Sequence, residues 1–241
     1  MSFMPATGPL SSLSIRARTY GWWRIVVQIV RVAACSAALA AMTAALPTKA
    51  EPPVKIVALG DSLTAGYGLS DKDGFVPRLQ AALAAEGIPV EIQNAGVSGD
   101  TASDGLARLD WSVPQSTDAV ILELGANDML RGIKPEATLG ALDGILRRLK
   151  ERHIAVLLCG MRAAPNLGPD YGQAFEHIFP ELAAKYSVLF YPFFLDGVAA
   201  DLSLLQHDGL HPNSKGVDVI VGRILPQVEA LIAQAHAQHP I

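Results

Sequence analysis

The chain has 241 residues, half of them hydrophobic and 17% charged, and its net charge is −4. This composition is typical of a folded enzyme and excludes collagen-like and intrinsically disordered chains. Five of the 19 Lys and Arg residues precede Glu51, but none of the 23 Asp and Glu residues does, so residues 51–241 alone carry a net charge of −9. This acidic balance argues against nucleic acid and anionic membrane surfaces as partners.

Residues 1–50 differ in pattern from the rest of the chain. Basic residues flank an apolar stretch, and small residues precede Glu51. This resembles a secretory signal cleaved near Ala50, and it predicts an exported domain over 51–241, in the periplasm or secreted. Three alternatives stay open: a retained membrane tether, although the unbroken stretch 32–46 is short for a span, a lipidated Cys35, or a tail without a targeting role.

After residue 53 the chain alternates between apolar strand patterns and helical patterns. The predicted strands are 54–59, 90–94, 118–124, 154–160 and 187–193, and the predicted helices are 74–87, 101–111, 134–153, 171–186 and 213–234. We expect Pro180 to kink the fourth helix, and Gly222 and Pro226 to interrupt the last one. Apolar strands separated by helices predict one α/β domain with a parallel sheet covered on both faces.

Four polar motifs follow predicted strands. They are "GDSLTAGYG" with Ser62, "NAGVSGDT" with Gly99, "GAND" with Asn127, and "HDGLHPN" with Asp208 and His211. In parallel α/β sheets the ligand binds at the carboxyl ends of the strands, where these motifs fall. The placement predicts that the four motifs contribute to one site.

Each motif has a functional and a structural interpretation. Ser62 is either a nucleophile or the N-cap of the next helix. Asp208 and His211, three residues apart, are either an acid–base pair or a helix cap, and a metal site with His207 is a weaker alternative because no further ligand cluster is evident. Asn127 and the Gly99 backbone are either donors to an oxyanion or ordinary turn residues.

Together the blocks "GDSL", "SGDT", "GAND" and "DGLHP" resemble those of the SGNH (GDSL) hydrolase superfamily, most closely its bacterial periplasmic thioesterase I, arylesterase and lysophospholipase group. The resemblance implies that Ser62 is the nucleophile, His211 the general base and Asp208 the residue that orients it. The oxyanion hole would then be the N–H groups of Ser62 and Gly99 and the Asn127 amide. It also implies a three-layer α/β/α sandwich with a flavodoxin-like strand order, 2-1-3-4-5.

The same resemblance predicts a serine esterase that needs no cofactor or metal and acts on acyl esters, with thioesters or lysophospholipids as further substrates. We expect a monomer without stable membrane insertion of the mature domain. Candidate pocket residues in the loop after the fourth strand are Leu167, Tyr171 and Phe175, although Phe175 is better explained as a core partner of Phe179. The alternatives are a carbohydrate O-acetylesterase and a non-catalytic lipid- or glycan-binding module on the same fold.

Overall fold

The computed structural model describes residues 24, 27–29, 31 and 52–238. The chain divides after Ala50 into two units, and every element named below belongs to the second, Glu51–Ile241. The predicted secretory signal falls almost entirely outside the described residues. Within the part that is described, no helix combines the length and the apolar character that a membrane crossing requires.

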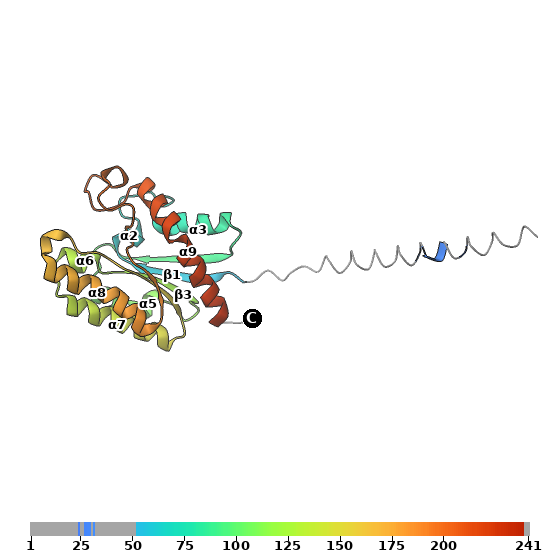
Figure 1. Cartoon of the computed structure of the whole chain (residues 1–241), viewed down its shortest axis with the longest axis horizontal. Coiled ribbons are helices and arrows are strands. Elements are labelled where there is room, and N and C mark those ends of the chain that lie inside the picture. Colours follow the sequence, from blue (N-terminus) through green and yellow to red (C-terminus); the bar gives the residue numbers. More distant parts are fainter. Residues whose placement is uncertain (1–23, 25–26, 30, 32–51, 239–241) are drawn as a thin grey trace, which may run out of the picture. The chain divides into compact units, whose positions relative to one another are not determined.

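A five-stranded parallel sheet forms the centre of the second unit (Figure 1). Its strands are β1 (Val54–Gly60), β2 (Val90–Gly96), β3 (Ala119–Glu123), β4 (Ala155–Cys159) and β5 (Leu189–Tyr191), in the order β2-β1-β3-β4-β5. This order confirms the flavodoxin-like topology that the family resemblance implies. The strand β5 is shorter than the apolar run 187–193, because Pro192 has no N–H to extend the ladder.

Helices cover both faces of the sheet (Figure 1). The helices are α2 (Ser62–Ala65), α3 (Phe75–Ala85), α4 (Ala102–Ala107), α5 (Leu109–Ser112), α6 (Ala126–Leu130), α7 (Pro135–Glu151), α8 (Pro169–Tyr186) and α9 (Ser214–Gln238), with single 3-10 turns at Pro165–Leu167 and Leu202–Leu204. Helices α3 and α9 pack together on one face, and α4, α7 and α8 pack on the other. The apolar stripe of α7, with Leu142, Ile145 and Leu149, is fully buried against the sheet.

Two predicted helices differ from the observed ones. The segment 101–111 is two helices that meet at Arg108, whose side chain is engaged with residues on either side of the break. The last helix, α9, continues without interruption through Gly222 and Pro226, so that prediction was wrong. The carbonyl that the ring of Pro226 crowds belongs to Gly222, four residues earlier, where the backbone has extra freedom to adjust.

The register of the strands places the motifs at one edge of the sheet. Gly60 at the end of β1 is paired with Gly96 of β2 on one side and Glu123 of β3 on the other. The loops after these three residues carry Ser62, Gly99 and Asn127. The carboxyl edge of the sheet therefore brings together residues that are up to 65 positions apart in the chain.

Candidate active site

Ser62, His211 and Asp208 form a continuous hydrogen-bonded row. The Ser62 Oγ lies 2.9 Å from His211 Nε2, and the other ring nitrogen, Nδ1, lies 2.7 Å from Asp208 Oδ2. Because the carboxylate accepts the proton on Nδ1, Nε2 is left as the acceptor that faces the serine hydroxyl. This geometry lets the imidazole remove a proton from Ser62 while Asp208 stabilises the resulting positive charge.

The turn in which Asp208 lies stabilises its charge. Its Oδ1 accepts hydrogen bonds from the backbone N–H groups of Leu210 and His211, at 2.9 and 3.0 Å. These two bonds and the contact with the His211 ring lower the pKa of Asp208 to about 2. The carboxylate is therefore ionised throughout the neutral range, although it is partly exposed to water.

The nucleophile loop, residues 60–68 with the candidate nucleophile Ser62, begins where β1 ends. Ser62 is the first residue of the one-turn helix α2, and its N-cap is Asp61, whose Oδ1 accepts the Leu63 N–H at 3.0 Å. Gly60 gives this turn its space, because a Cβ there would lie 2.0 Å from Thr64 Oγ1 and 2.7 Å from Glu123 Oε2. The glycine before Asp61 is thus required by side chains that occupy the volume beside it.

The three groups expected to bind an oxyanion differ in their present contacts. Within the described part of the chain, neither the Ser62 N–H nor the Gly99 N–H has a hydrogen-bond partner. The Asn127 amide instead donates to Asp61 Oδ2 at 3.1 Å and to the Asp100 carbonyl at 3.0 Å. A substrate oxygen would therefore share or replace one of the bonds that hold Asn127 in place.

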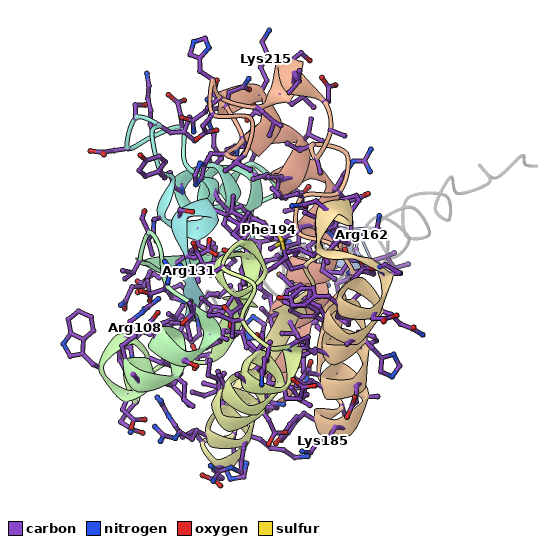
Figure 2. All side chains as sticks on the ribbon, turned by 90° about the vertical axis from the view of Figure 1, so that its left-hand side faces the viewer. Arg108, Arg131, Arg162, Lys185, Phe194 and Lys215 are labelled. Carbon is purple, nitrogen blue, oxygen red and sulfur yellow. The ribbon has the colours of Figure 1, made fainter. Side chains whose placement is uncertain are left out.

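Arg108 connects the nucleophile loop to the loop of Gly99. Its Nε donates to Asp100 Oδ2 at 2.6 Å, and its Nη2 donates to the Gly60 carbonyl at 2.9 Å. Both partners of this ion pair are largely buried, with side chains 14% and 13% exposed. A hydrogen-bonded ion pair that is largely shielded from water fixes the two loops relative to each other. Figure 2 faces this edge of the sheet and labels both Arg108 and Arg131. The Arg131 guanidinium donates to the Gly99 carbonyl at 2.7 Å.

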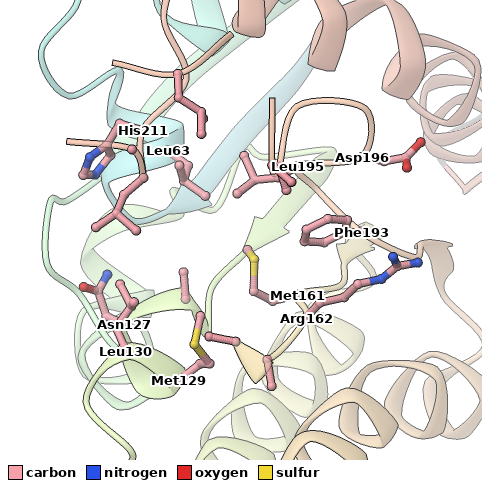
Figure 3. A pocket seen from close by; sticks show the side chains of 18 of the residues that line it. Leu63, Asn127, Met129, Leu130, Met161, Arg162, Phe193, Leu195, Asp196 and His211 are labelled. Atoms are coloured by element: carbon pink, nitrogen blue, oxygen red, sulfur yellow. The ribbon is translucent and has the colours of Figure 1, made fainter. Parts of the chain in front are cut away.

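An apolar cavity of about 550 Å³ begins at Ser62 and His211. Figure 3 shows Leu63, Asn127 and His211 at one end of the cavity and Phe193 with Arg162 at the other, with Met161 between them. The Arg162 guanidinium lies 4.9 Å from the centre of the Phe193 ring. A cavity of this size and apolar character fits an acyl chain.

The three pocket residues proposed from the sequence do not line this cavity. Phe175 is fully buried and meets Phe179 edge to face, with ring centres 5.5 Å apart. Tyr171 stacks on Phe175 and donates its hydroxyl to the Ile133 carbonyl at 2.9 Å, and Leu167 packs against the core. The same loop does reach the cavity, but through its earlier part, 161–165. Tyr171 and Phe175 belong to helix α8 and Leu167 to the 3-10 turn before it, so their position after the fourth strand did not by itself place them in the cavity wall.

Two further contacts hold the His211 loop, and the sequence offered little sign of either. The Gln206 amide donates to the Tyr67 carbonyl at 2.7 Å and to the Pro212 carbonyl at 3.0 Å, which ties the loop after α2 to the loop of His211. The Tyr67 ring lies 4.7 Å from the His211 ring. The glycine at position 68 is the one feature of the sequence that relates to these contacts, because a Cβ there would lie 2.2 Å from Gln206 Oε1.

His207 is exposed, and His211 uses both ring nitrogens in the row described above. Over residues 52–238 and the few described before them, no three or more His, Cys, Asp and Glu side chains are grouped closely enough to hold a metal ion. The hydrogen-bonded row of Ser62, His211 and Asp208 is arranged for acid–base chemistry on a hydroxyl.

Comparison with known proteins agrees with this chemistry. Residues 58–219 match the GDSL-like Lipase/Acylhydrolase family. Esterase TesA of Pseudomonas aeruginosa is 35% identical over 178 residues, which cover 73% of this chain and 89% of that protein. The thioesterase 1/protease 1/lysophospholipase L1 of Escherichia coli K12 is also 35% identical, over 73% of this chain and 84% of its own length.

Solved structures give the same result. AlinE4, described as an SGNH-hydrolase family esterase, is 44% identical and superposes with a TM-score of 0.63, covering 74% of this chain and 96% of its own. The matched regions include all four motifs at the carboxyl edge of the sheet. The chain therefore belongs to the GDSL-like lipase/acylhydrolase family of SGNH hydrolases, and it is a carboxylic ester hydrolase.

Proposed function

We propose that this enzyme hydrolyses carboxylic esters through an acyl intermediate on Ser62. The observation that carries the proposal is the unbroken row from Ser62 through His211 to Asp208 at the mouth of an apolar cavity. A serine hydroxyl becomes a nucleophile when a base takes its proton in the same step, and His211 Nε2 is within reach to do so.

The reaction then proceeds in two halves. Ser62 Oγ bonds to the acyl carbon while its proton moves to His211, and the tetrahedral intermediate collapses as His211 returns that proton to the leaving alcohol. Water next attacks the acyl-serine, again losing a proton to His211, and the acid is released with Ser62 restored. In both halves Asp208 holds the ring and balances its transient charge.

The oxyanion of each tetrahedral intermediate is assigned to the Ser62 and Gly99 N–H groups and the Asn127 amide. The two backbone donors are free in the described part of the chain, which leaves them available to a substrate. Asn127 lines the cavity beside Ser62. The two backbone donors are already in place before the reaction begins, so they need no reorganisation when negative charge develops on the substrate oxygen.

The substrate class follows from the cavity. Its lining side chains include Leu63, Met129, Leu130, Met161 and Leu195. Burial of each methylene of an acyl chain against such a surface contributes about 0.8 kcal/mol, so we propose acyl esters or lysophospholipids longer than acetate as substrates, and thioesters as a further class. The names of the relatives, an esterase and a thioesterase/lysophospholipase, support the same range.

The first test is the S62A variant of the full-length protein, assayed on p-nitrophenyl butyrate. We expect kcat to fall by about 10⁴- to 10⁶-fold with the fold intact by circular dichroism. A fluorophosphonate probe should label the wild type at Ser62 and fail to label the variant. Near wild-type turnover in S62A would remove the assignment, and a wild type that takes no label would favour a non-catalytic lipid- or glycan-binding module.

A panel of substrates tests the acyl chain. Rates on p-nitrophenyl esters of increasing chain length, on a lysophospholipid, on an acyl thioester and on acetylxylan are compared on the same preparation. We expect kcat/KM to rise beyond the acetyl ester, because the cavity buries further methylenes. A preference for acetylxylan over every acyl ester would instead identify a carbohydrate O-acetylesterase.

We also propose that residues 1–50 direct export and that the domain over 51–241 acts as a monomer outside the cytoplasm, in the periplasm or secreted. Five basic residues, an apolar stretch and small residues before Glu51 support this assignment. N-terminal sequencing of the protein recovered outside the cytoplasm should begin near Glu51. Recovery of an uncleaved chain from membranes would identify residues 1–50 as a tether, and light scattering of the purified domain tests the monomer.

A further inference from the structure

Glu123 is a buried carboxyl group directly behind the nucleophile loop. It is the last residue of β3, it is paired with Gly60 at the end of β1, and its exposed fraction is zero. Among the described residues no Lys, Arg or His forms an ion pair with it, and its Oε1 has no hydrogen-bond partner. A buried glutamate without an ion-pair partner is an expensive core residue, so its presence at this position calls for a role.

Its other oxygen contacts the residues on both sides of the nucleophile. Glu123 Oε2 accepts a hydrogen bond from Thr64 Oγ1 at 2.8 Å and a longer one from the Asp61 N–H at 3.4 Å. Thr64 is itself 1% exposed, and the missing side chain of Gly60 leaves the space in which these groups meet. One carboxyl oxygen thus holds the start of helix α2 on either side of Ser62.

We propose that Glu123 is a positioning residue of the esterase reaction, which aligns Ser62 with His211 by fixing Asp61 and Thr64 from within the core. The inference rests on the proposed function of Ser62. Glu123 does not touch the substrate cavity and acts only through the turn that carries the nucleophile. Placement of a reacting atom matters at this scale, since an error of about 1 Å can lower turnover about 100-fold.

The surroundings of Glu123 also define its charge. Glu123 faces the carboxyl of Asp61, the N-cap of α2, and the buried Cys159 of β4. The guanidinium of Arg108, at the end of α4, donates to the nearby Gly60 carbonyl, to Asp100 and to Ser112, none of which is Glu123. Burial, and then repulsion from Asp61, raise the pKa of Glu123 well above its usual value. This environment favours the neutral carboxylic acid, whose Oε2 still accepts from Thr64 and from the Asp61 N–H.

The test compares the E123Q and E123A variants of the full-length enzyme on p-nitrophenyl butyrate. E123Q keeps an acceptor oxygen and the shape of the neutral acid, so we expect kcat within about threefold of wild type and an unchanged pH profile of kcat/KM. E123A removes the acceptor, so we expect kcat to fall about 10- to 100-fold with little change in KM. The rate of fluorophosphonate labelling should fall in parallel.

Thr64 provides an independent second test, which also covers the case in which E123A does not fold. T64V removes the hydroxyl donor at nearly constant volume and should lower kcat without changing KM, and T64S should restore it. Because Thr64 and Glu123 act through one bond, the E123A/T64V double variant should lose little more than E123A alone. The control is L146A, the loss of an equally buried side chain beside Ile154 and Val188 at the amino ends of β4 and β5. It should lower stability and leave kcat unchanged.

Each result has a defined meaning. If wild type is labelled at Ser62 and folded E123A turns over at the wild-type rate, or if T64V does so, the positioning role is refuted while the proposed function stands. If E123Q shifts the acid limb of the pH profile, Glu123 is an ionised group acting on His211 by charge, and the inference is wrong. If wild type itself takes no label at Ser62, the proposed function fails first.

Discussion

The nucleophile loop touches two acidic regions that differ in their exposure to water. Asp208 is partly exposed, accepts two backbone N–H groups, and has its pKa lowered to about 2. Asp61 and Glu123 are fully buried, and burial raises the pKa of Asp61 to about 6 and that of Glu123 well above its usual value. The same functional group is therefore an exposed carboxylate with a lowered pKa on one side of Ser62, and a pair of buried carboxyls with raised pKa values on the other.

The difference teaches which carboxyl can serve the histidine. Stabilising an imidazolium requires an anion that persists at neutral pH, and backbone donors supply this at Asp208 without burial. Asp61 lies closer to Ser62 in the chain, but it is bonded to Leu63 and Asn127 and organises the loop instead. Proximity in sequence is thus a poorer guide to the acid of the row than its hydrogen-bond environment.

Among the changes that test this comparison, we expect the largest fall in kcat from removing the charge of the exposed Asp208. D208N should lower kcat by about 10³- to 10⁴-fold, because the amide presents a donor to His211 Nδ1 and favours the wrong tautomer. The matched control is D201N, since Asp201 also accepts the N–H two residues on, from Ser203 at 2.9 Å, in the same stretch of chain. Full activity in D208N would mean that another group balances the charge of His211.

Asn127 lies between the buried carboxyl groups and the substrate cavity, because its amide donates to Asp61 and its side chain lines the cavity beside Ser62. We expect N127A to lower kcat about 100- to 1000-fold through the loss of one oxyanion donor. The exposed Asn166 provides the control, N166A, which should behave as wild type. A rise in KM at constant kcat in N127A would place the amide in substrate binding and not in the transition state.

Gly60 tests how tightly the buried region is built. G60A places a methyl group where Thr64 Oγ1 and Glu123 Oε2 now lie, so we expect the free energy of unfolding to fall by about 1–3 kcal/mol and turnover to fall with it. The same substitution at Gly140, inside α7 with nothing within 4 Å of the added Cβ, should instead stabilise by about 0.4–1 kcal/mol. Urea unfolding of both variants measures the pair, and equal effects would show that the space beside Gly60 can relax.

The smallest effect concerns pH. The folded pKa values of Asp61 and Glu123 are raised, so their contribution to stability is complete below the unfolded values near 4 and is lost as the pH rises through the folded values, about 6 for Asp61. E123Q replaces the ionisable carboxyl of Glu123 by an amide that does not titrate. Its melting temperature should therefore match wild type near pH 4 and exceed it by about 2–4 °C at pH 8. The exposed Glu151 gives the control, E151Q, and a flat difference between pH 4 and pH 8 in E123Q would contradict the raised pKa.

The sequence by itself determined the α/β fold class, and its motifs, through their resemblance to a known family, predicted the strand order and the candidate residues of the site. Parallel strands end at one edge of a sheet, so motifs after consecutive strands had to meet there, and Ser62, Asp208 and His211 do so. These motifs are local in the chain, with turn residues and chemistry in the same few positions. Periodicity also located the helices, although Gly222 and Pro226 predicted an interruption that α9 does not have.

Only the tertiary structure decided what surrounds the site. Glu123 ends a strand that reads as uniformly apolar apart from that residue, and its role depends on Thr64 and Gly60, which belong to a different strand and loop. The wall of the cavity after β4, with Met161 and Arg162 in place of the expected Leu167 and Tyr171, depends on how two loops meet across the sheet edge. Volume and burial are properties of contacts between distant segments, and for that reason no local pattern in the chain encodes them.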